Sequence, residues 1–183
     1  MTTAVTRRPV VGVMGSSTQA HEDVAAPLGR LLAGIGVHLL TGGGVAAMGA
    51  VSQAFAEVSP RAGLVIGVLP SDLPDGVPVP RPGYPNPWVE IAIFTHLRLS
   101  GISGTDPRSR NHINILSSDV VVVLPGGEGT QSEAELAVRY HKPAIAFLGD
   151  NTVAWPVPGA IRVARTIEEV DAFVRRHLGG RLA

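Results

Sequence analysis

The sequence predicts an α/β fold: a doubly wound parallel sheet with helices on both faces, in three layers and a single domain. Short runs rich in valine, isoleucine and leucine alternate with longer stretches in which apolar residues recur every three or four positions. Strands buried on both faces read as continuous apolar runs, and strands that alternate with helices form parallel sheets. The length, 183 residues, suits one domain spanning 1–183.

Each expected element has its own signal. In the first helix, apolar residues at Leu28, Leu32 and Ile35 form one stripe that should pack on the sheet. In the last, Thr166 and Glu169 have the spacing of a capping box. The predicted strands lie at 9–14, 37–41, 63–69, 90–95, 119–124, 143–148 and 160–164. The predicted helices lie at 22–35, 45–58, 107–117, 130–141 and 167–178.

The segment from Pro70 to Pro87 breaks this alternation. It carries seven prolines, which exclude a regular helix or a central strand because proline lacks the backbone N–H. We expect a rigid loop that flanks the site formed by the strand ends.

Composition narrows the classes of partner. Lys plus Arg and Asp plus Glu balance at 15 each, which argues against nucleic-acid or anionic-membrane binding. Charged residues make up only 16% and hydrophobic residues 45%, so we expect a homodimer or homotetramer that covers apolar surface. No apolar run is long enough for a membrane span, and the N-terminal run is too short for a signal peptide, so we expect a cytoplasmic protein.

Three glycine-bearing loops follow predicted strands. In an open parallel sheet ligands bind beyond the carboxyl ends of the strands. Glycine lets the backbone approach a ligand, and the next helix offers unpaired N–H groups, so such loops suit a phosphate. The candidate phosphate-binding residues are Gly15, Ser16 and Ser17 in the first loop, Thr41, Gly42, Gly43 and Gly44 in the second, and Pro125, Gly126, Gly127, Gly129 and Thr130 in the third.

Two charged residues near the third loop are open to two interpretations. With Thr130 as a helix N-cap, Glu133 fits a capping box; alternatively, its carboxylate points into the pocket beside the glycines. Arg110 lies in a predicted helix before the fifth strand, where it is either a solvated helix residue or a ligand contact.

Several familiar sites are not supported by the sequence. There is no cysteine, and the six histidines form no pair at i, i+4, so we expect no metal site. The dinucleotide and P-loop motifs GxGxxG and GxxxxGK[ST] are absent, as is the nucleophile motif GxSxG.

Two segments, "PGGEGTQSE" (125–133) and "TGGGVAAMGA" (41–50), resemble the PGGxGTxxE and TGGGxGxMEA signatures of the Lonely Guy superfamily. Members of this superfamily are also known by an older name, lysine decarboxylase-like proteins. Arg110 also has the family's spacing of fifteen residues before Pro125. The run "RNHINILSSDVVVVLPGGEGTQSEAELAV" at 110–138 is most similar to the molybdenum cofactor carrier branch. The resemblance implies a Rossmann-like fold and adds Met48 and Asn111 to the candidate ligand-binding residues.

The resemblance leaves two functions open. A carrier would bind and protect the molybdenum cofactor through its phosphate, without breaking a bond. A phosphoribohydrolase would cleave nucleoside 5′-monophosphates, with Arg110 orienting the substrate, Glu133 near the ribose and no cofactor required. Asn111 stands where the hydrolases usually have lysine, and Ala46 and Gly49 replace a glycine and a glutamate of their signature, which favours the carrier.

Overall fold

The computed structural model describes residues 7–182. Residues 1–6, part of the stretch in which we expect no signal peptide, and residue 183 lie outside the described residues. No helix in the described part is long and apolar enough to cross a membrane.

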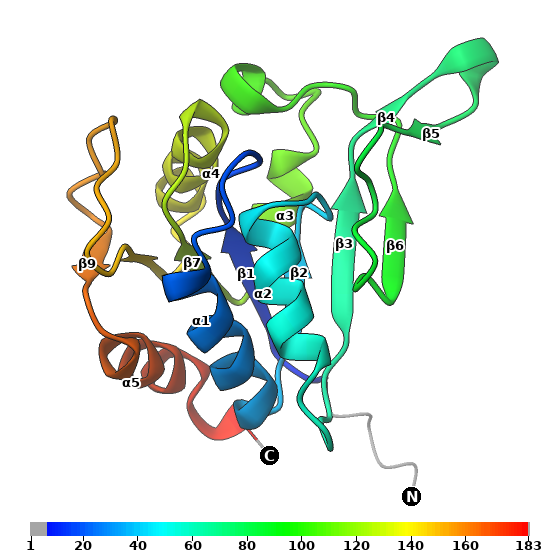
Figure 1. Cartoon of the computed structure of the whole chain (residues 1–183). Helices are drawn as coiled ribbons and strands as arrows, with labels where there is room; N and C mark the ends of the chain where they lie inside the picture. Colours follow the sequence, from blue (N-terminus) through cyan, green and yellow to red (C-terminus); the bar gives the residue numbers. More distant parts are fainter. Residues whose placement is uncertain (1–6, 183) are drawn as a thin grey trace, which may run out of the picture.

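Seven parallel strands form one central sheet (Figure 1). They are β1 (Val10–Met14), β2 (His38–Thr41), β3 (Val65–Leu69), β6 (Ile91–Phe94), β7 (Val120–Val123), β8 (Ala144–Phe147) and β9 (Arg162–Ala164). Their order is β6-β3-β2-β1-β7-β8-β9, so the chain builds the sheet outward in both directions from β1. This is the doubly wound, Rossmann-like sheet that the alternating pattern predicts, and all seven expected strands are present.

Five α-helices cover the sheet: α1 (Glu22–Ile35), α2 (Ala47–Ala56), α3 (Asn111–Ser117), α4 (Glu128–Arg139) and α5 (Ile167–Leu178). In Figure 1, α1, α2 and α5 lie in front of the sheet, and α3 and α4 lie behind it. The predicted capping box at Thr166 and Glu169 forms at the start of α5. The three-layer prediction is therefore confirmed.

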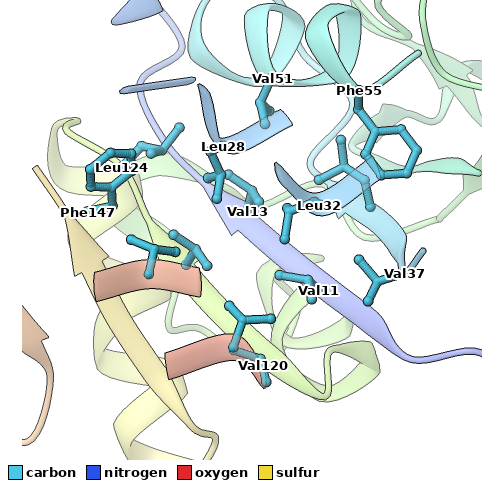
Figure 2. Packing of buried hydrophobic residues seen from close by; sticks show 14 of the residues in the cluster. Val11, Val13, Leu28, Leu32, Val37, Val51, Phe55, Val120, Leu124 and Phe147 are labelled. Atoms are coloured by element: carbon cyan, nitrogen blue, oxygen red, sulfur yellow. The ribbon is translucent and has the colours of Figure 1, made fainter. Parts of the chain in front are cut away.

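Two apolar cores lie on the two faces of the sheet. The four valines of β7 alternate between them: Val120 and Val122 pack with α1, α2 and α5, and Val121 and Val123 with α3 and α4. Figure 2 shows the first core, in which Leu28 and Leu32 of α1 and Phe55 of α2 meet the valines of β1. Burial on both faces explains why the strands read as continuous apolar runs.

Predicted boundaries were wrong in three helices: α2 spans Ala47–Ala56 and not 45–58, and α4 ends at Arg139 and not at 141. Helix α3 begins at Asn111 and not at 107, because residues 106–109 form a turn in which Ser109 N–H donates to the carbonyl of Asp106. Arg110 is therefore the N-cap residue of α3. Helix α4 begins at Glu128, two residues before the expected Thr130, with Gly127 as its N-cap.

The proline-rich segment forms more than a loop. Two residue pairs make a short antiparallel ladder between β4 (Ser71–Asp72) and β5 (Val79–Pro80), joined through the 3₁₀ turn η1 (Pro74–Gly76). This hairpin projects beyond the carboxyl ends of the sheet (Figure 1). It does not join the central sheet, as the prolines require.

Candidate functional site

A cavity of about 330 Å³ lies where the strand order reverses, beyond the carboxyl ends of β1 and β7. This is the place where open α/β sheets bind ligands, because the connections on the two sides lead to opposite faces and leave a crevice. The predicted site residues that line it are Gly15, Ser16, Ser17, Met48, Arg110, Asn111, Gly127, Gly129, Thr130 and Glu133. The predicted residues Thr41, Gly42, Gly43, Gly44, Pro125 and Gly126 do not line it.

The N-terminus of α4 opens into this cavity through Gly127, Glu128, Gly129 and Thr130. The first backbone N–H that is bonded within the helix belongs to Gln131, which donates to the carbonyl of Gly127 at 3.0 Å. The N–H groups of Glu128, Gly129 and Thr130 meet no acceptor within residues 7–182. Unpaired N–H groups at a helix start, together with the helix dipole, attract an anion.

The capping box expected at Thr130 and Glu133 is absent, since Thr130 is the third residue of α4. Gly127 starts the helix in an extended conformation, at φ −99° and ψ −151°. Gly126 makes room for the Thr130 side chain, since a methyl group there would lie 2.8 Å from Thr130 Cβ. Glu133 is thereby one turn inside the helix, on the side of the cavity.

The first loop is locked to both of its neighbours by Ser16. The N–H of Ser16 donates to the carbonyl of Pro125 at 3.1 Å, and its carbonyl accepts from the N–H of Ala47 at 3.2 Å. The Ser16 hydroxyl accepts from the N–H groups of Thr18 and Gln19. These bonds, all made by the buried Ser16, hold Gly15 and Ser17 at the cavity wall.

Arg110 is a buried cation that forms no ion pair within 4.0 Å in residues 7–182. Its side chain is 4% exposed, and neither Nε nor Nη1 has a hydrogen-bond partner in the described part of the chain. Gly42 provides space for the guanidinium, since a methyl group on Gly42 would lie 2.6 Å from Arg110 Nη2. Buried donors without partners are costly, so an arginine in this state is suited to an anionic ligand.

Glu133 lies in the same cavity and is buried, at 7% exposure. One carboxylate oxygen, Oε1, accepts a hydrogen bond from Asn114 Nδ2 at 3.1 Å. Burial raises the pKa of Glu133, while the positive charge of Arg110 and the Asn114 hydrogen bond act in the opposite direction. The net upward direction means that the carboxyl holds its proton to a higher pH than an exposed glutamate.

Asn111 is anchored on one side only. Its Nδ2 donates to the hydroxyl of Ser132 at 3.2 Å, and its backbone N–H donates to Ser109 Oγ. Its Oδ1 is buried and has no partner in the described residues. Asn111, which lines the cavity, therefore has an unused acceptor, and Arg110, the residue before it, has unused donors.

Three hydrogen bonds within the protein hold the second loop. Thr41 Oγ1 accepts from the N–H of Gly43, and Asn86 bonds both neighbouring carbonyls: its N–H donates to Gly43 at 2.7 Å and its Nδ2 to Gly44 at 2.9 Å. Only Met48, in the helix that follows, lines the cavity. The loop supports the site from behind.

Six cavity residues were not among the predicted ones: Thr18, Tyr84, Ser100, Gly101, Ile102 and Glu128. Glu128 lies inside the third glycine loop and Thr18 directly follows the first, so proximity in sequence could have found both. Tyr84 comes from the proline-rich segment, which the sequence placed beside the site without naming a residue. Residues 100–102 belong to the connection after β6, and nothing local in the sequence shows that Gly101 packs on Gly129.

No group of three or more histidine, aspartate or glutamate side chains that could hold a metal ion occurs in residues 7–182. The direct donors of the cavity are instead backbone amides, hydroxyls, one guanidinium and one carboxamide. That set suits an oxyanion with a polar organic group attached.

Comparison with known proteins agrees with this architecture. The structure of the molybdenum cofactor binding protein from the phototrophic bacterium Rippkaea orientalis has 31% sequence identity and a TM-score of 0.70; the alignment covers 96% of this chain and 100% of that one. The molybdenum cofactor carrier protein from Chlamydomonas reinhardtii has 29% identity and a TM-score of 0.67, with 94% and 99% covered. No curated protein sequence matches.

The sequence model of the SLOG cluster4 family matches residues 8–169, which include every strand, the cavity and both signature segments. This match and the two structural neighbours confirm the resemblance to the Lonely Guy superfamily and its carrier branch. The chain belongs to the SLOG cluster4 family.

Proposed function

We propose that this protein binds the molybdenum cofactor and carries it in a protected form, with the phosphate at the N-terminus of α4 and the pterin in the rest of the cavity. The observation that carries the proposal is the buried Arg110, whose Nε and Nη1 have no partner beside three free N–H groups of α4. A phosphate would satisfy donors of both kinds. The solved relatives named as cofactor carrier or binding proteins align along nearly the whole chain.

The remaining wall suits the organic part of such a ligand. Tyr84 offers an aromatic surface, and Met48 lies near it, since a methyl group on Gly44 would contact both side chains at about 3 Å. Aromatic and thioether groups pack well against a planar heterocycle. The protein would act in the cytoplasm as a homodimer or homotetramer.

The test is transfer of the cofactor. The purified protein is loaded with molybdenum cofactor, separated from free cofactor and mixed with apo nitrate reductase. We expect activity to return in proportion to the cofactor carried. An Arg139→Met variant, which removes an exposed arginine at the far end of α4, serves as control. Absence of any cofactor on the protein after gel filtration counts against the proposal.

One observation favours a second candidate function, hydrolysis of nucleoside 5′-monophosphates. Glu133 places a carboxyl group in the same cavity as Arg110, and a carboxylate can stabilise the oxocarbenium-like centre formed when an N-glycosidic bond breaks. Burial raises the pKa of Glu133 and so disfavours the charged form that this role requires. Release of free base from AMP, CMP or isopentenyl-AMP, lost in Glu133→Gln, would establish this activity.

A further inference from the structure

Asn111, a residue that lines the cavity, has a polar side-chain atom without a partner in the described residues. Asn111 Oδ1 is buried, on a residue that is 2% exposed, and has no donor within residues 7–182. The dianion of a phosphate ester presents only acceptors, so the groups that hold it cannot include this oxygen. A buried acceptor without a donor is unfavourable, so a ligand that donates a hydrogen bond to it would bind more tightly.

The orientation of the Asn111 amide is fixed by Ser132. A hydroxyl carries one proton, and the Ser132 hydroxyl donates to the carbonyl of Gly129 at 2.7 Å. It can therefore only accept from Asn111, which requires Nδ2 to face Ser132, at 3.2 Å. Gly104 packs on this pair, because a methyl group there would lie 2.8 Å from Ser132 Cβ. Oδ1 is left as the free end of the amide.

We infer that Asn111 determines specificity by accepting a hydrogen bond from an N–H or O–H group of the ligand, next to the anion held by Arg110 and α4. The inference deepens the proposed function and rests on it. It defines the ligand class as a phosphate ester with a donor close to the phosphate-bearing arm. Ser132 is a positioning residue, since it sets the amide without lining the cavity. A lysine at position 111, as the hydrolases usually have, would donate a hydrogen bond and would therefore favour a ligand with an acceptor at this place.

The first experiment compares two probes on Asn111→Leu, which keeps the side-chain size and removes the acceptor. We expect the dissociation constant for the molybdenum cofactor to rise on the order of 10- to 100-fold. Inorganic sulfate, measured by competition, should bind as it does to the unmodified protein, because the sulfate dianion carries no proton and offers no donor. Gln53→Leu, which changes an exposed amide on α2 outside the cavity, is the control.

Ser132→Ala gives a second variant that leaves Asn111 in place. Without the hydroxyl the amide is free to rotate, so we expect a smaller loss of cofactor affinity and again no change for sulfate. A general loss of structure would weaken both probes together. Equal losses for cofactor and sulfate in both variants, or unchanged cofactor binding in Asn111→Leu, overturn the inference.

A third experiment, with AMP as the ligand, shows whether the donor is a hydroxyl or a ring N–H. It also distinguishes failure of the carrier proposal from failure of the inference about Asn111. If AMP loses affinity on removal of its 2′-hydroxyl, and Asn111→Leu abolishes that difference, the donor is a hydroxyl. If Asn111→Leu weakens the cofactor and leaves AMP unchanged, the donor is a ring N–H. When the unmodified protein binds AMP and not the cofactor, the carrier proposal fails and the AMP comparison decides the role of Asn111. If neither ligand binds, both proposals fail.

Discussion

The second and third glycine loops, at 41–44 and 125–130, are alike in sequence and differ in their position at the cavity. In the second, the carbonyls of Gly43 and Gly44 accept from Asn86, the N–H of Gly43 donates to Thr41, and no residue of 41–44 lines the cavity. In the third, the N–H groups that follow Gly127 have no acceptor in the described residues and belong to residues that line the cavity. Glycine shows where a backbone bends or approaches a neighbour; an anion site also needs free N–H groups at the cavity.

The contrast also separates direct from indirect contributions to one cavity. The third loop lines the space, whereas Gly42 of the second loop touches Arg110 from behind. Changes in the two loops should therefore affect ligand binding and stability in different proportions.

The largest expected effect is on the residue that both loops serve. Arg110→Met removes the buried cation at similar length, and we expect cofactor affinity to fall at least about 100-fold, because truncating a charged partner in a desolvated site is costly. Equilibrium dialysis measures it, with Arg139→Met as the control. Retained affinity would show that the α4 amides hold the anion alone.

Asn86→Ala should destabilise the second loop most. The substitution removes the donor to the Gly44 carbonyl and the acceptor for the N–H of Trp88. Both bonds are buried, since Asn86 is only 2% exposed. We expect the free energy of unfolding, from urea titration, to fall by about 2 kcal/mol. A much smaller change would mean that water replaces these bonds.

Gly42→Ala tests whether the second loop acts on the site through Arg110. The added methyl group would lie 2.9 Å from Arg110 Cζ, so the guanidinium must move. We expect cofactor affinity to fall about tenfold, since a displaced donor loses part of a charge-assisted hydrogen bond. Gly34→Ala, on α1, is the matched control, because a methyl group there meets nothing within 4 Å.

Ala46→Gly should raise stability. Ala46 has φ 59° and ψ −127°, a conformation that only glycine adopts without strain. We expect a gain of about 1 kcal/mol in the free energy of unfolding. This would account for the glycine that the superfamily signature has at this position; a loss of stability would contradict the backbone described here.

Glu133→Gln should produce the smallest effect, visible in the pH dependence. Because the folded pKa of Glu133 is raised above its ordinary value of 4.5, stability from this group is present below that pH and is lost as pH rises through the folded pKa. In the glutamine variant that decline should vanish. Thermal unfolding of the ligand-free protein at a series of pH values measures it, and parallel curves for the two proteins would exclude a raised pKa.

Most of the fold could be predicted because its signals are local. Valine runs such as 120–123 identify strands buried on both faces, and the stripe through Leu28 and Leu32 identifies α1. The start of α4 could not be predicted, since the spacing of Thr130 and Glu133 fits a capping box equally well. The extended conformation of Gly127 and the packing of Thr130 on Gly126 decide that boundary, and both are tertiary.

The site could be predicted as far as the strand order allows. Placing loops at the carboxyl ends of strands brings Ser16, Arg110 and Gly129 to one edge. It does not reveal which loop lines the cavity, so Gly43 and Gly44 looked as suitable as Gly127. The part played by Tyr84 and Gly101 depends on long connections that fold back over the edge, and no local pattern records that return.

The backbone N–H and carbonyl of Ser16 connect the loop after β1 with two segments that are far away in the chain. These are Pro125, after β7, and Ala47, at the start of α2. Ser16 thus links the two arms of the fold, which grow from β1 in opposite directions, at the wall of the cavity. A molecule seated there would clamp both arms at once. A bound ligand would then stabilise the folded state of the whole domain. The loaded protein should therefore resist proteolysis even at peptide bonds remote from the cavity.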